Sequence, residues 1–142
     1  MESAKQHNDM TEFFGEVIST YSRAQASEDG VLVDVTETAS EVGFRWPVAI
    51  TQAAWLDCVE WTEEDSKRQT YQDLSGRLWD VVWMAFMAIR STRSSGTQLM
   101  FQLYRVPRGG KKTTARKVTL KLVTGPGDNG EPVVTIMLLN ED

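Results

Sequence analysis

The sequence predicts an α+β fold in which N-terminal helices pack on a C-terminal three-stranded antiparallel meander. Before SSG (94–96), apolar residues recur at helical spacing and are preceded by capping residues. After SSG, apolar and polar residues alternate in three runs with turn-forming sequences between them. A chain of 142 residues, 41% of them hydrophobic, can bury one continuous core. We therefore expect a disordered N-terminus over residues 1–9 and a single domain over residues 10–142.

Short helices are expected in the first part of the chain. Residues 10–21 carry apolar side chains on one helical face. Ser22 then predicts an N-cap, with a capping box completed by Gln25, for a helix over residues 23–28 that ends at Gly30. VLVDV (31–35) is a candidate short strand or extended segment. It is followed by a helical turn over residues 37–42 that Asp34 or Thr36 would cap and Gly43 would end.

A longer helix is expected in the middle of the chain. FRWPVAIT (44–51) should be extended because Pro47 restricts the residue before it, and Thr51 should cap a helix over residues 52–61. TEEDSKRQT (62–70) is interpreted as a polar connection. The strongest helical pattern covers residues 71–93. Its apolar stripe consists of Tyr71, Leu74, Leu78, Val82, Ala85 and Ile89, widened by Trp79, Trp83 and Phe86.

Three alternating runs follow, around residues 99–103, 118–122 and 134–138. The segments PRGGKKTTA and TGPGDNGEP connect them. The second contains the turn dipeptide Asn129-Gly130 and lacks the ligand spacing of an EF-hand and the lysine of a P-loop. We therefore interpret it as a hairpin turn.

The sequence contains no recognisable catalytic arrangement. The single histidine, His7, lies in the polar N-terminus, and the single cysteine, Cys58, is expected to be a buried structural thiol. A carboxylate pair such as Asp57 and Glu60 occurs in any acidic domain and so does not indicate an active site. A small hydrolase built on carboxylates is kept as an alternative. We expect a protein that is not an enzyme and that holds no metal and no cofactor.

Charge is distributed unevenly along the chain. Residues 1–65 contain fourteen acidic and three basic side chains, whereas residues 66–142 contain six acidic and twelve basic ones. The segment RVPRGGKKTTARKVTLK (105–121) has seven basic residues and no acidic residue in a chain of net charge −5. This charge asymmetry gives information about binding partners rather than about the fold. The alternative is that the two halves neutralise each other across the folded surface.

A basic hairpin that contacts nucleic acid or a host nucleoprotein is the first hypothesis. Pairing of the first two strands would gather six cations at one hairpin end, with a tip made flexible by Gly109-Gly110. Such a ribbon can follow a phosphate backbone. The alternative is a tip that only protects an exposed edge. The proposed contact residues are Arg105, Arg108, Lys111, Lys112, Arg116 and Lys117.

An acidic surface that occupies a basic region of a protein partner, without contacting nucleic acid, is the second hypothesis. Carboxylate arrays can attract basic proteins by the same Coulombic logic as phosphates. The candidate residues are Glu60, Glu63, Glu64 and Asp65.

The expected location is the cytoplasm, with no membrane partner. The first eleven residues lack a secretory h-region, and the longest apolar run, around residues 78–89, is too short to span a bilayer. The single cysteine excludes an intramolecular disulfide. The oligomeric state is left open.

Three stretches resemble a known family. ISTYSRAQASEDGVLVDVTETASEVGFRWPVAIT (18–51), LWDVVWM (78–84) and VTLKLVTGPGDNGEPVVTIML (118–138) are similar to an uncharacterised small domain family of bacterial phages, plasmids and other mobile elements. This resemblance implies an accessory protein encoded near anti-restriction genes, with an anti-defence role such as inhibition of a CRISPR or restriction complex. It carries over no catalytic residue.

Overall fold

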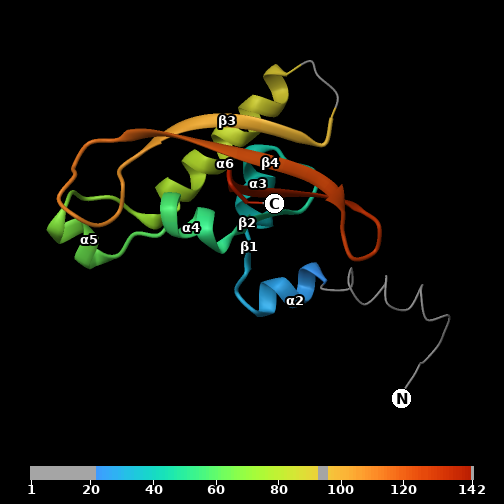
Figure 1. Cartoon of the computed structure of the whole chain (residues 1–142), viewed down its shortest axis with the longest axis horizontal. Helices are drawn as coiled ribbons and strands as arrows, with labels where there is room; N and C mark the ends of the chain where they lie inside the picture. The colour runs from blue at the N-terminus through green and yellow to red at the C-terminus, as the bar shows by residue number, and fades with distance from the viewer. Residues whose placement is uncertain (1–21, 93–95, 142) are drawn as a thin grey trace.

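A five-stranded mixed sheet forms the centre of the protein in the computed structural model, which describes residues 22–92 and 96–141. The strand order is β1-β2-β5-β4-β3, and the β2–β5 pair is parallel while the other pairs are antiparallel. Figure 1 shows the two long strands β3 and β4 side by side. The strands are β1 (Leu32–Asp34), β2 (Val48–Thr51), β3 (Gln98–Arg105), β4 (Arg116–Pro126) and β5 (Pro132–Leu138).

The α+β class is confirmed, but the predicted three-stranded antiparallel meander under N-terminal helices is wrong. The three C-terminal runs do pair antiparallel, yet β2 adds to β5 in parallel, with Val48 opposite Val134. The helices also alternate with the first two strands instead of preceding the sheet. The physical reason is that β5 would otherwise leave one row of backbone hydrogen-bonding groups unpaired, and the short apolar run VAIT fills that position.

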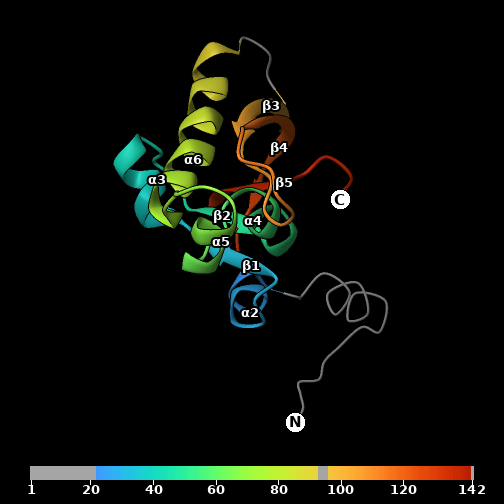
Figure 2. The same cartoon turned by 90° about the vertical axis from the view of Figure 1, so that its left-hand side faces the viewer.

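One face of the sheet is covered by three helices that share its core. They are α3 (Thr36–Val42), α4 (Gln52–Cys58) and α6 (Leu74–Ser91). Figure 2 shows α6 lying along one side of the sheet. Every strand contributes side chains to this core, and those of Ile50, Leu120 and Ile136 are fully buried. Their burial against the helices supplies the main apolar contribution to stability.

The first described helix, α2 (Arg23–Glu28), is capped from two directions. The Ser22 hydroxyl accepts a hydrogen bond from Gln25 N, as the sequence predicts. The Asp128 carboxylate of the β4–β5 turn accepts from the backbone N–H groups of Arg23 and Ala24 at 2.7 and 3.1 Å. The Arg23 side chain also donates to Thr135 Oγ1 on β5. The glycine-rich turn therefore ties α2 to the sheet, and its interpretation as a hairpin turn is confirmed.

Two further sequence predictions need correction. Residues 62–70 are not only a connection, because they contain helix α5 (Glu63–Arg68). Trp79 and Trp83 do not widen the buried stripe of α6, since they are 39% and 42% exposed. The core side of this helix instead includes Val81 and, unexpectedly, the side chain of Arg77. The predicted helix over residues 10–21 and the predicted disorder over residues 1–9 lie outside the described residues.

Gly43 should be intolerant of any side chain. Its φ of 139° is rarely adopted by L residues, and a Cβ built there would lie 2.7 Å from the Phe86 ring. We expect Gly43→Ala to lower the free energy of unfolding by about 2–3 kcal/mol, as measured by urea denaturation. Gly125→Ala is the matched control, because a Cβ at Gly125 meets no atom within 4 Å. Equal stability of the two variants would contradict this account of the α3 end.

Candidate functional site

The basic arm, defined as residues 105–117, connects the end of β3 to the start of β4. Gly109 and Gly110 have φ values of 93° and 73°, which allow the chain to reverse at the tip. In Figure 1 the arm runs beside α5. The arm is held by polar contacts from Asp57, Asp65 and Gln69, and by the buried side chain of Val106.

Arg105 fixes the root of the arm to α4. Its guanidinium forms an ion pair with Asp57, with Nη2 2.7 Å and Nε 2.9 Å from the Asp57 Oδ1 atom. Nε also donates to the Asp57 backbone carbonyl. Because the Arg105 side chain is only 15% exposed, its guanidinium interacts mainly with Asp57 and little with solvent.

Arg108 contacts a buried carboxylate in the first turn of α5. Its Nε lies 2.7 Å from Asp65 Oδ2, and Asp65 also closes a capping box with Thr62. Burial opposes the charged carboxylate, but hydrogen bonds from Arg108 and from the Thr62 N–H and hydroxyl outweigh it and lower the pKa of Asp65. One carboxylate thus caps a helix and holds the arm.

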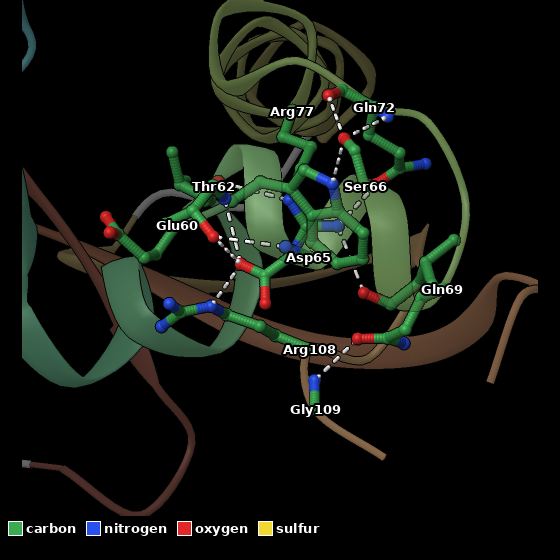
Figure 3. Close-up of polar contacts among 12 residues, drawn as sticks. Glu60, Thr62, Asp65, Ser66, Gln69, Gln72, Arg77, Arg108 and Gly109 are labelled. Carbon is green, nitrogen blue, oxygen red and sulfur yellow. Dashed lines mark hydrogen bonds and ion pairs between the residues drawn. The ribbon is translucent and has the colours of Figure 1, made fainter. Parts of the chain in front are cut away.

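Gln69, which directly follows α5, forms hydrogen bonds to the backbone at the tip of the arm. Its Nε2 donates to the carbonyls of Pro107 and Lys112 at 2.9 and 2.6 Å, and its Oε1 accepts from Gly109 N at 2.7 Å. Figure 3 shows Arg108 directed toward Asp65 and Gly109 toward Gln69. A single amide side chain therefore bridges both sides of the arm, which pre-organises a glycine-containing tip.

The other four cations of the arm are not anchored in this way. Their side chains are exposed, and no carboxylate of the described residues lies within ion-pair distance of them. The arm therefore has an inner pair, Arg105 and Arg108, neutralised by Asp57 and Asp65, and an outer cation set. The outer cation set consists of Lys111, Lys112, Arg116 and Lys117.

The four candidate acidic residues do not share one environment. Glu63 and Glu64 are exposed in the first turn of α5. Glu60 is partly buried and accepts a hydrogen bond from Trp55 Nε1. Asp65 is 4% exposed and engaged by Arg108. Only Glu63 and Glu64 are therefore fully presented to solvent.

Arg77 on α6 lies beneath the arm and was not singled out by its sequence pattern. It is 6% exposed, stacks over Trp61 at 4.5 Å, and donates to the carbonyls of Val59 and Val106. Its Nη1 also donates to Gln72 Oε1. Of the residues that organise this site, only Asp65 had a readable local signal, the Thr-x-x-Asp capping pattern after residue 61.

Cys58 is a structural thiol, as expected. It is 1% exposed, and burial raises its pKa to about 11, so the thiol is neutral at physiological pH. Within residues 22–92 and 96–141 no group of three His, Cys, Asp or Glu side chains could hold a metal ion. In the same part of the chain, no helix combines the length and hydropathy of a membrane span. His7 lies outside the described residues.

Comparison with known proteins places the chain in a family. Residues 10–142 match the model of a family of unknown function (DUF6573). The chain belongs to this family. No curated protein and no solved structure matches it. DUF6573 membership supports the resemblance to an uncharacterised small domain family, and it assigns no activity to the arm.

Loss of the Asp65 charge should destabilise the protein in a pH-dependent way. Because the pKa of Asp65 is lowered in the folded state, the charged carboxylate stabilises the fold above the unfolded pKa, and this contribution is lost as pH falls through the folded pKa. We expect Asp65→Asn to lower the free energy of unfolding at pH 7 by about 1–2 kcal/mol. Urea denaturation should show this difference in free energy shrinking as the pH falls below the ordinary pKa of an aspartate. A pH-independent difference would contradict the assignment.

Loss of the Gln69 amide should loosen the arm. Gln69→Ala removes three hydrogen bonds to the arm backbone and leaves its cations in place. We expect trypsin to cleave after Lys111 and Lys112 several-fold faster, because these bonds hold the tip against local opening. Gln52→Ala, at an exposed position of α4, is the control. Equal cleavage rates in wild type and Gln69→Ala would show that the amide does not restrain the arm.

Proposed function

We propose that the protein is a non-enzymatic binding protein whose basic arm contacts the phosphate backbone of a nucleic acid, alone or within a nucleoprotein. The observation that supports this most directly is the division of the arm into anchored and exposed cations. Arg105 and Arg108 are held by carboxylates, whereas the outer cation set extends into solvent. Exposed, unpaired cations on a fixed support are suited to phosphate contacts.

Pre-organisation favours binding over edge protection as the role of the arm. Charged side chains can protect an exposed strand edge without a fixed tip. Here Gln69 forms three hydrogen bonds to the arm, and the tip is held beside α5. Ordering the arm before binding lowers the entropic cost of association. Tyr104, 65% exposed and opposite Lys117 in the β3–β4 ladder, adds an aromatic surface on which a base could stack.

The biological setting that we propose is a mobile genetic element, with the protein acting as a cytoplasmic anti-defence factor against a host CRISPR or restriction complex. The support is the resemblance of the sequence to small accessory proteins of phages and plasmids. Binding to a host nucleoprotein through phosphate contacts would fit an inhibitor that competes for nucleic acid. The alternative of an acidic inhibitor has less support, because Asp65 is buried and only Glu63 and Glu64 are fully presented.

Removal of two outer cations should weaken nucleic-acid binding and its salt dependence. We expect Lys111→Ala/Lys112→Ala to bind duplex DNA, single-stranded DNA or RNA about tenfold more weakly at low salt. Binding then releases fewer counterions, because two phosphate contacts are lost. The slope of log K against log salt should therefore become shallower by about 1.4–1.8. Fluorescence anisotropy with labelled oligonucleotides over a salt series measures both quantities.

The matched control removes the same charge elsewhere. Arg45→Ala/Arg90→Ala takes two exposed cations from outside the arm, so an effect of net charge alone would weaken both variants equally. Equal loss would contradict a localised contact, and undetectable binding by wild type at low salt would contradict the proposal itself. In that case charge reversal at Glu63 and Glu64, followed by partner binding, tests the acidic alternative.

A further inference from the structure

The strands β3 and β4 turn one face toward the core and the other toward solvent. Phe101, Leu103 and Leu120 belong to the core, and α6 packs on that side of the strands (Figure 2). Side chains alternate along a strand, and directly opposite residues share a face. The remaining residues of the ladder therefore point away from the core, and we call their surface the open face. It consists of Gln98, Met100, Gln102, Tyr104, Lys117, Thr119, Lys121 and Val123.

Two large side chains are exposed on the open face. Met100 and Tyr104 are 62% and 65% exposed, although Phe101 and Leu103 of the same strand are buried. The Tyr104 ring makes no aromatic or cation–π contact with the described residues. The two side chains lie four residues apart, which is about 13 Å at about 3.3 Å per residue. A free ring face and an adaptable thioether are suited to packing against a planar ligand.

The charged residues of the open face are both cations. Lys117 lies opposite Tyr104 in the ladder, is exposed, and forms no ion pair with the described residues. Lys121 lies opposite Met100 and is largely buried. Within residues 22–92 and 96–141 the only fully buried side-chain nitrogen or oxygen without a partner is Arg77 Nη2, so the unpaired Lys121 ammonium keeps some contact with solvent. Each lysine thus lies across the ladder from a side chain that can pack on a base.

A polar pair, Gln102 and Thr119, separates these two positions on the ladder. Gln102 Nε2 lies 3.5 Å from Thr119 Oγ1, at the limit of a hydrogen bond, so the amide and the hydroxyl can bond to another partner. A shallow hollow of about 460 Å³ is formed here by Met100, Phe101, Gln102 and Thr119. Pockets for small ligands begin at about 300 Å³, so the hollow is large enough for one base.

We propose that the open face binds an unpaired nucleic-acid strand, with bases on Tyr104 and Met100 and phosphates at Lys117 and Lys121. This inference rests on the proposed function of the basic arm and specifies its substrate class. The outer cation set ends at Lys117, where the open face begins, so one strand can contact both surfaces. A duplex also offers phosphates, but its bases are stacked on one another and cannot lie on the Tyr104 ring. Stacking and phosphate contacts involve no 2′-hydroxyl, so DNA and RNA strands are both ligands.

The charge of the open face argues against a second copy of this chain as the occupant. Two open faces packed together would bring Lys117 and Lys121 of one copy against the same residues of the other. No acidic side chain lies on the open face to compensate them. Juxtaposed like charges oppose association, whereas a phosphate backbone complements them.

Fluorescence anisotropy with oligothymidine, which cannot pair with itself, tests the proposal against a duplex of the same length. We expect wild type to bind a strand of about 16 nucleotides about tenfold more tightly than the duplex at about 150 mM salt, because salt weakens phosphate contacts more than stacking. Tyr104→Ala should weaken single-strand binding about ten- to a hundredfold and leave duplex binding unchanged. Tyr104→Phe keeps the ring and should retain the affinity. Tyr71→Ala removes an exposed tyrosine outside the open face and is the matched control.

A strand of abasic sites isolates the contribution of the bases. It keeps the phosphates, so wild type and Tyr104→Ala should bind it equally. The slope of log K against log salt should also be the same for both proteins, because the substitution removes no charge. Thermal unfolding checks the fold, and the Tm of Tyr104→Ala should match that of wild type because the side chain is exposed.

The outcomes separate this inference from the proposed function. If wild type binds duplex and single strand equally, or if Tyr104→Ala binds the single strand like wild type, the open face is not the site and the arm proposal stands. If wild type binds no nucleic acid at low salt, the arm proposal fails and this inference fails with it. Sedimentation of the protein alone tests the other occupant. A wild-type dimer that Tyr104→Ala converts to a monomer would show that a second copy covers the open face, and would overturn the inference.

Discussion

The Arg77 guanidinium connects three parts of the protein that are distant in sequence. It is carried by α6, donates to the carbonyl after α4 and to the carbonyl of Val106 beyond β3, and stacks on Trp61 before α5. Its burial has a high desolvation cost, which these contacts offset only in part because all the acceptors are neutral. Arg77 therefore helps to fix the arm root relative to the long helix, together with the ion pair between Arg105 and Asp57.

The contacts around this centre explain why an acidic protein carries a basic segment. Asp57 and Asp65, from the acidic first half, neutralise Arg105 and Arg108 across sequence separations of 48 and 43 positions. The two halves thus compensate each other where the arm meets the body. The outer cation set extends beyond this region and has no such partner among the described residues. Neutralisation, one of the two alternatives for the charge pattern, accounts for Arg105 and Arg108, and the proposed binding concerns only the outer cation set.

Periodicity identified the buried side of α6 but not its width. Val82 and Ala85 of the predicted stripe are buried, and Leu74, Leu78 and Ile89 pack against the core. The sheet selects the side with Val81, Val82 and Ala85, while Trp79 and Trp83 remain substantially exposed. A buried arginine on the selected side could not be expected from composition, since its acceptors come from elements that only the tertiary fold brings near.

The sequence by itself determined the local features: the Ser22, Thr51 and glycine-defined helix ends, the three alternating strand runs, the hairpin turn and the buried thiol. Apart from the burial of Cys58, which depends on tertiary packing, each of these features depends on residues within a few positions of one another, so local propensity is sufficient. The tertiary structure alone decided the parallel β2–β5 pairing, the anchoring of the arm by Gln69 and Asp65, and the unpaired charge of Arg77. These features join distant segments, and their free energy depends on burial and geometry that no short pattern encodes.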